Sequence, residues 1–290
     1  MFVATVGAGS FAKSAQRLAL TRSAIGKAIA RLEARLGAPL FRRTTRSLTL
    51  TPDGQLYYER CVRALEELRQ GEAMLASGRL EVSGKLKVAM PVLFGSHCVA
   101  PILLELAHDN PGLHLDLRFS DSMVDLVADG YDLAVRIGVP GDQPGLMTKR
   151  VAGLMKTVCA APSYVSLRGE PSAVVDLADH EVLILRLHDR PYFWDLHDAY
   201  GPIPDLPLAG RLQFDNHTSM VDAALRGMGI AQLPEWLVRP HVEAGRLLPL
   251  LESFSAPPTD TYVVWPAVQF EPLRLRAAID ALAAKLVSRI

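Results

Sequence analysis

The chain has 290 residues, of which 49% are hydrophobic, and this size predicts two or three compact units rather than one small core. It has no run of about 18 uninterrupted apolar residues, which excludes a membrane-spanning helix. The N-terminus lacks the basic, apolar and small-residue pattern of a secretory signal, so we expect a cytoplasmic protein.

The formal net charge is zero, but the charges are unevenly distributed along the chain. Residues 1–60 hold ten of the 31 Lys and Arg residues against three acidic residues, and the remainder holds 21 basic and 28 acidic residues. A basic field over one small unit is typical of a surface that binds phosphate groups. The pattern therefore indicates a nucleic-acid partner for the N-terminal unit.

Two short helices are predicted in this unit. Ser10 is a candidate N-cap for a helix over 11–18, and Thr21 for a second helix over 22–36 that Gly37 ends. Two such helices separated by a tight turn predict a helix-turn-helix. The side of the second helix opposite its apolar stripe carries small or basic residues, namely Ser23, Gly26, Lys27, Ala30 and Arg31.

Residues near the start of a recognition helix reach base edges, and an arginine can bond a guanine through two hydrogen bonds. A solvated basic face would explain the pattern equally well if this helix stood alone. Residues 40–50, however, place apolar and β-branched residues on either side of a basic turn, which predicts a two-stranded wing along the phosphate backbone. We therefore expect a DNA-binding surface formed by Ser10, Thr21, Arg22, Ser23, Lys27, Arg31, Arg42, Arg43 and Arg46.

The stretch from Gly9 to Gly54, GSFAKSAQRLALTRSAIGKAIARLEARLGAPLFRRTTRSLTLTPDG, resembles the DNA-binding domain of LysR-type regulators. It contains the family's IxxLExxLGxxLFxR run and its LTxxG helix start. The resemblance implies a sequence-specific transcriptional regulator that is not an enzyme and needs no cofactor. It also implies that Met1 is a truncated or internal start, because the family's first helix begins several residues earlier. Arg22 and Gly26 replace the family's frequent glutamine and serine, which affects base preference rather than binding mode.

A competing pattern lies at the N-terminus, where residues 2–6 followed by G-x-G-x-x-A match the phosphate turn of a dinucleotide-binding fold. That fingerprint requires a second strand after one helix, ending in an acidic residue about twenty positions on. Two predicted helices follow instead, and the nearest acid, Glu33, lies inside the second, so we reject this reading. The chain also lacks G-x-S-x-G, P-loop and H-E-x-x-H motifs.

The three cysteines, Cys61, Cys98 and Cys159, are far apart and odd in number. None forms a C-x-x-C pair, so we expect buried thiols rather than a disulfide framework or a zinc site.

Residues 53–77 are continuously helical in character and carry a stripe with near-heptad spacing, formed by Tyr58, Cys61, Leu65, Leu68 and Leu75. So long a helix cannot bury this stripe on the small head alone, and we expect it to pair with a second copy. Packing on the C-terminal body is the alternative. The resemblance implies a linker helix of a homodimer, a homotetramer, an imperfect inverted-repeat operator in double-stranded DNA, and RNA polymerase as a partner if the protein is an activator.

From residue 84 onward strands and helices alternate, with helices expected over 100–108 and 123–129 of the first block. Such alternation predicts an α/β body with parallel strands and helices on both faces. The segments DLVADGYDLAVRIG, CAAPSYV and AALRGMGIAQLP resemble the family's two-lobed effector domain, which has a periplasmic-binding-protein fold. The expected fold class is therefore α/β multidomain, with a winged helix-turn-helix over 1–52, a linker helix over 53–83 and an effector domain over 84–290. Lobe I is expected over 84–160 and 263–290 and lobe II over 161–262, with crossings near Cys159 and Tyr262.

Ligands in such folds bind at strand carboxyl ends and helix N-termini, where free amides favour an anion. We therefore expect a small effector, anionic or aromatic, bound by Phe94, Gly95, Ser96, Ser120, Asp121, Arg136, Ile137, Gly138, Asn216, His217 and Thr218. Helix capping explains the serines and threonine equally well, and pairing between lobes explains Arg136 equally well. A secreted solute receptor is the alternative for the body, but it requires a signal peptide and has no use for a basic head. The expected location is the cytoplasm, associated with the nucleoid.

Overall fold

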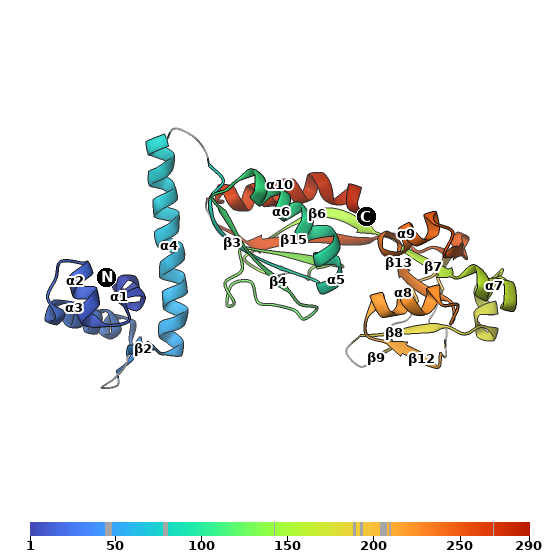
Figure 1. Cartoon of the computed structure of the whole chain (residues 1–290), viewed down its shortest axis with the longest axis horizontal. Helices are drawn as coiled ribbons and strands as arrows, with labels where there is room; N and C mark the ends of the chain where they lie inside the picture. Colours follow the sequence, from blue (N-terminus) through green and yellow to red (C-terminus); the bar gives the residue numbers. More distant parts are fainter. Residues whose placement is uncertain are drawn as a thin grey trace.

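The computed structural model describes residues 1–43, 48–77, 81–141, 143–187, 190–191, 194–203, 208, 210–268 and 270–290. The described chain forms a small helical head with a hairpin, one long helix and a two-lobed α/β body (Figure 1). This confirms the expected fold class. Within the described residues, no helix is both long and apolar enough to span a membrane.

The head contains the two helices and the hairpin that the sequence predicts, together with a further helix before them that was not predicted. The predicted elements are α2 (Phe11–Arg17), α3 (Arg22–Leu36), β1 (Phe41–Arg43) and β2 (Leu48–Leu50), and the additional helix is α1 (Phe2–Ala8). The Ser10 hydroxyl accepts the Lys13 amide and the Thr21 hydroxyl accepts the Ala24 amide, so both expected N-caps are confirmed. Gly37 ends α3 at φ 68°, which suits glycine. Residues 2–8 are helical, so the strand that a dinucleotide-binding turn needs is not there.

Buried apolar residues from all parts of the head form one cluster. Ile25 and Ile29 of α3 are fully buried, whereas Leu36 at the end of the helix is 40% exposed. The helix α4 (Pro52–Ser77) packs on this cluster through Tyr57, Tyr58 and Cys61. The ring centroids of Phe2 and Tyr57 lie 5.4 Å apart. The N-terminal part of α4 is therefore joined to the head.

The turn from α3 into the wing depends on one carboxylate. Glu33 Oε1 accepts the backbone amides of Leu40 at 2.8 Å and Phe41 at 3.1 Å. Next to it, a Cβ on Gly54 would lie 2.0 Å from the Leu40 carbonyl oxygen, so only glycine allows α4 to approach this closely.

Lobe I is built on a five-stranded sheet of order β4-β3-β5-β15-β6. Its elements are β3 (Gly84–Met90), α5 (Val92–Phe94), the π-helix η1 (Gly95–Val99), α6 (Ala100–Asp109), β4 (Leu113–Phe119), β5 (Leu133–Ile137), β6 (Leu146–Leu154), β15 (Thr259–Pro266), α10 (Leu273–Lys285) and η4 (Leu286–Arg289). Strand β3 pairs in parallel with β4 and β5, but β15 is antiparallel to β5 and β6. The expectation of a parallel sheet is therefore wrong for the strand that returns from lobe II.

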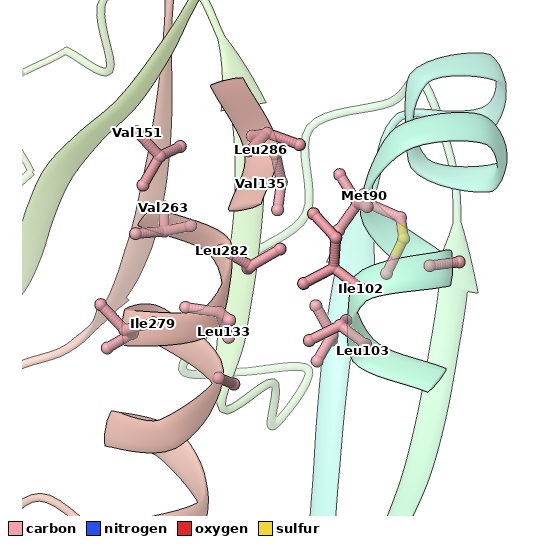
Figure 2. Packing of buried hydrophobic residues seen from close by; sticks show 14 of the residues in the cluster. Met90, Ile102, Leu103, Leu133, Val135, Val151, Val263, Ile279, Leu282 and Leu286 are labelled. Atoms are coloured by element: carbon pink, nitrogen blue, oxygen red, sulfur yellow. The ribbon is translucent and has the colours of Figure 1, made fainter. Parts of the chain in front are cut away.

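Helices α6 and α10 cover one face of this sheet, where Ile102 and Leu282 meet strand residues such as Val135 (Figure 2). The other face holds Ala89 and Ala134, and buried Leu126 from the 120–132 loop covers them. Helices on both faces, and a helix over 123–129, were thus wrong expectations for lobe I. The residues at 123–129 form turns, because the Asp125 carboxylate caps a turn that Gly130 ends at φ 69°.

Lobe II contains two small sheets, of order β13-β7-β14 and β12-β8-β9, and a two-stranded hairpin. Its elements are β7 (Lys156–Ala160), α7 (Pro162–Arg168), η2 (Val174–Asp179), β8 (Leu183–Leu187), β9 (Arg190–Pro191), β10 (His197–Asp198), β11 (Gly201–Pro202), β12 (Leu212–Phe214), α8 (His217–Leu225), β13 (Ala231–Pro234), α9 (Glu235–Glu243), β14 (Leu248–Leu250) and η3 (Glu252–Phe254). Cys159 lies inside β7 of lobe II and Tyr262 inside β15 of lobe I. The chain therefore crosses between lobes near Met155 and before Thr259, a few residues earlier than expected at each place.

Two of the three cysteines are buried thiols. Cys98 and Cys159 are buried, and burial raises the pKa of Cys98 to about 11 and that of Cys159 to about 12. Cys61 is only half-buried beside the head, so the expectation of three buried thiols is wrong for this residue.

We predict that Glu33→Ala lowers the free energy of unfolding by about 1–3 kcal/mol, because two partly buried amides lose their acceptor. Glu33→Gln keeps an acceptor oxygen and is expected to lose less. Urea unfolding checks this, with the exposed Glu59→Ala on α4 as the control. A loss in Glu33→Ala no larger than in the control contradicts the prediction.

Candidate nucleic-acid interface and ligand cavity

The outward face of α3 presents the residues that the sequence predicts for DNA binding. Thr21, Arg22 and Ser23 are exposed at its start, and Lys27 and Arg31 are exposed farther along. They face outward because Ile25 and Ile29, on the opposite side of the helix, are held in the core. Ser10 is half-buried, and its hydroxyl caps α2.

The wing places further basic residues next to this helix in sequence. Arg42 is exposed in β1, opposite Thr49 of β2. Arg43 lies in the same strand, but its side chain is outside the described part of the chain, as is the whole of Arg46. Because Glu33 of α3 holds the amides that begin the wing, one side chain sets the position of the wing relative to the helix.

A cavity of about 580 Å³ lies between the two lobes and is lined by residues from both. This volume is within the range of sites that bind small organic molecules. Most of the lining side chains are apolar, including Met90, Leu93, Phe94, Met123, Val124, Leu154, Met155, Leu185, Leu233 and Trp236. Trp236 of α9 packs edge-on against Phe94, with ring centroids 5.9 Å apart, so the two lobes touch at this wall.

Seven of the eleven predicted effector residues line this cavity, namely Phe94, Ser120, Asp121, Arg136, Ile137, Gly138 and His217. The other four do not. Gly95 packs under Met90, Ser96 donates to the Leu93 carbonyl, Asn216 caps α8 by accepting the Ser219 amide, and Thr218 is exposed outside the lining.

Sequence reasoning missed several lining residues, among them Lys156, Gln232 and Trp236. Lys156 lies where the chain enters lobe II, and the other two lie on either side of the end of β13. Pro234 ends β13, and a proline at this position is a sequence signal for the end of a strand. It could have added the end of β13 to the strand ends at which ligand-binding residues were predicted.

Arg136 holds two loops of lobe I together. Its guanidinium donates to Gln143 Oε1 at 3.1 Å and to the Val124 carbonyl oxygen at 3.1 Å. Burial lowers the pKa of this guanidinium. Both partners belong to lobe I, so these bonds organise the cavity wall of one lobe rather than pair the two lobes.

A cluster of polar side chains lies on the lobe II side of the cavity. The Lys156 ammonium lies 3.4 Å from one carboxylate oxygen of Asp195, and His197 Nε2 lies 3.4 Å from the other. Gln232 fixes the backbone of Asp195 through two hydrogen bonds. Its Oε1 accepts from the Asp195 backbone amide at 3.0 Å, and its Nε2 donates to the Asp195 backbone carbonyl oxygen at 2.8 Å. A cation therefore lies at the cavity wall in a fixed position.

His217 is a neutral group within this lining. Burial lowers its pKa, the Asp121 carboxylate partly offsets this, and Lys156 lowers the pKa further. At neutral pH the imidazole is therefore a hydrogen-bonding group rather than a cation.

A basic helix-turn-helix head joined by a long helix to a two-lobed body around a cavity defines a DNA-binding protein with a separate ligand-binding body. Comparison with known families agrees with this class. Residues 1–55 match "Bacterial regulatory helix-turn-helix protein, lysR family", and residues 79–287 match "LysR substrate binding domain". The chain belongs to the LysR family of transcriptional regulators.

Relatives and solved structures cover nearly the whole chain. An HTH-type transcriptional regulator of Xanthomonas campestris is 30% identical over 99% of this chain and 84% of its own length. CrgA of Neisseria meningitidis is 30% identical over 99% of this chain and 95% of its own length. The solved CrgA structure matches with a TM-score of 0.63 over 98% of this chain and 96% of that chain. Full-length AphB of Vibrio cholerae, 24% identical, matches with a TM-score of 0.63 over 98% and 96%, which shows the shared fold.

We predict that His217→Gln reduces the loss of stability on acidification. The pKa of His217 is below its ordinary value of 6.5 in the folded protein, so the unfolded chain binds the proton more readily. The contribution of His217 to the free energy of unfolding is then fully present above about pH 6.5, and it is lost as the pH falls towards the lower, folded pKa. Urea unfolding at about pH 7.5 and about pH 5 measures the difference. The exposed His114→Gln is the control and is expected to behave as the wild type, and an unchanged pH dependence in His217→Gln contradicts the prediction.

Proposed function

We propose that the head binds double-stranded DNA with α3 in the major groove and the wing on the backbone. The supporting observation is the start of α3, where a capped helix end exposes Arg22 and Ser23 towards solvent. In this proposal these two residues read base edges, and the caps Ser10 and Thr21 present helix N-termini to phosphates. Phosphate contacts come from Lys27, Arg31, Arg42, Arg43 and Arg46.

Arg22→Ala and Arg31→Ala are expected to weaken DNA binding in different ways. Arg22→Ala should lose about 1–3 kcal/mol on the protein's own upstream DNA and little on a shuffled fragment. Arg31→Ala should weaken both fragments alike and reduce the slope of affinity against salt by about one. Fluorescence anisotropy at two salt concentrations measures both effects.

The exposed Arg226→Ala of lobe II is the matched control, since it removes the same charge far from the head in the chain, and should change neither affinity. Equal losses on both fragments for both head variants would contradict the division between base and phosphate contacts.

A second copy completes the proposed DNA-binding unit. On α4, Leu65 is 44% and Leu68 is 64% exposed, so the body of the same chain does not cover these leucines. Tyr58 and Cys61 of the predicted stripe pack against the head instead, and the side chain of Leu75 is outside the described part of the chain. Pairing of two such helices gives a twofold homodimer suited to an imperfect inverted repeat. A homotetramer, contact with RNA polymerase if the protein activates, and a place in the cytoplasm at the nucleoid complete the proposal.

The interlobe cavity is the proposed site for the effector. Its walls are mostly apolar, and its charged lining groups are the Lys156 ammonium, the Arg136 guanidinium and the carboxylates of Asp121 and Asp215, with His217 neutral. Either cation could bind an anionic group of a ligand. This combination suits a small molecule with an aromatic or aliphatic body and one carboxylate. Binding of such a molecule between the lobes would shift their relative placement and thereby operator binding.

Sodium benzoate is a suitable probe of this site. Its binding is expected to raise the thermal midpoint in a saturable way, stabilising the fold by about 2.7 kcal/mol at a hundredfold excess over its Kd. Lys156→Met should reduce this effect, whereas Lys149→Met, a lysine on β6 that pairs with Asp280 outside the lining, should not. Neutral benzamide should stabilise less than benzoate. An equal rise in wild type and Lys156→Met would show that Lys156 does not bind the carboxylate.

A further inference from the structure

The loop between β4 and β5, residues 120–132, contacts two parts of the molecule, and we name it the cavity loop. Residues 120–124 line the interlobe cavity. Farther along, the Val127 carbonyl oxygen accepts a hydrogen bond from the Arg60 guanidinium of α4. A residue of the cavity wall and a residue that holds the linker helix are therefore only three positions apart in one loop.

The part of the cavity loop that meets Arg60 is firmly held. Asp125 Oδ1 accepts the amides of Val127 at 3.0 Å and Ala128 at 2.9 Å. Leu126 is buried against the sheet, and its carbonyl accepts the Tyr131 amide at 2.8 Å. Because these bonds join consecutive residues, the turn that presents the Val127 carbonyl moves as one unit.

The other end of the loop is anchored by groups that a ligand in the cavity would meet. The Val124 carbonyl oxygen accepts from Arg136 at 3.1 Å, and Asp121 Oδ1 accepts the Val92 amide at 3.0 Å. Arg136 and Asp121 both line the cavity. A ligand that displaces either side chain therefore alters an anchor of the loop.

On the other side of the contact, Arg60 lies on the part of α4 that holds the head. Tyr57 and Cys61, on either side of it in sequence, pack against the head cluster. Four aspartates between residues 121 and 132 also make the cavity loop acidic, which favours an arginine partner.

We infer that Arg60 is a positioning residue that ties the linker helix and its DNA-binding head to the cavity loop, so that the cavity and the head are physically linked. The inference rests on the proposed function, because it supplies a route from the ligand to the DNA. Its central contact can nevertheless be tested on the free protein and with DNA alone.

A double-mutant cycle on DNA affinity tests the link in the full chain. Asp125→Ala loosens the turn that presents the Val127 carbonyl, and it should change affinity for the upstream DNA about fivefold or more while Arg60 is present. In an Arg60→Met background the same change should have little effect. Arg60→Lys keeps a donor and should restore much of the dependence on Asp125. Arg69→Met, which removes the same charge about two and a half turns farther along α4, should leave that dependence unchanged.

Hydrogen exchange on the protein without DNA gives an independent readout. Arg60→Met should increase exchange in peptides covering the cavity loop severalfold, and Arg69→Met should not. The inference is overturned if Asp125→Ala has the same effect with and without Arg60, or if loop exchange is unchanged in Arg60→Met. If the wild type fails to bind DNA, the proposed function fails, and the exchange result still decides whether the contact exists.

Discussion

Strand β15 is the constraint on which the body of the molecule depends. It returns from lobe II and pairs with both β5 and β6, aligning Thr261 with Ile137 and Thr259 with Leu154. Because it lies between two strands that precede lobe II in the chain, lobe I completes its sheet only after lobe II has been traversed. Lobe II is thus an insertion whose two connections lie side by side, and Leu154, Met155 and Thr259 at those connections line the cavity.

The cavity takes its chemistry from this arrangement. Strands β3 and β5 run parallel, so the turns that follow them meet at one edge of the sheet and supply Phe94 and Gly138 to the wall. The opposing wall comes from the start of β7 and the end of β13, which are paired in the other lobe. A ligand in the cavity touches both lobes. Because the two chain connections between the lobes lie side by side, the motion that such a ligand can favour is a rotation of one lobe relative to the other about these connections.

The uneven distribution of charge along the chain matches the separate roles of the head and the body. The basic head attracts the phosphate backbone, whereas the more acidic body is repelled from it. The acidic cavity loop meets the linker helix at Arg60, so an acidic part of the body contacts a residue of the basic N-terminal segment. The opposite charges of the two surfaces favour this contact.

Features set by near neighbours could be read from the amino-acid order. The caps at Ser10 and Thr21, the stop at Gly37, the wing strands and the long helix were all predicted because each depends on residues within a few positions. The predicted strand ends also indicated which edge of the sheet lines the cavity. Phe94, Asp121 and Arg136 were therefore predicted correctly as lining residues.

Features that join distant residues required the folded chain. Alternation of strands and helices does not tell which sheet a strand enters, so the antiparallel place of β15 and the early crossing at Met155 were missed. The helix expected over 123–129 was also wrong. The Asp125 carboxylate caps a turn there and Gly130 ends it, and the apolar pattern of these residues did not indicate this. Lys156 and Trp236 reach the cavity through pairings with distant segments, and such contacts form only when the hydrophobic cores of both lobes have packed.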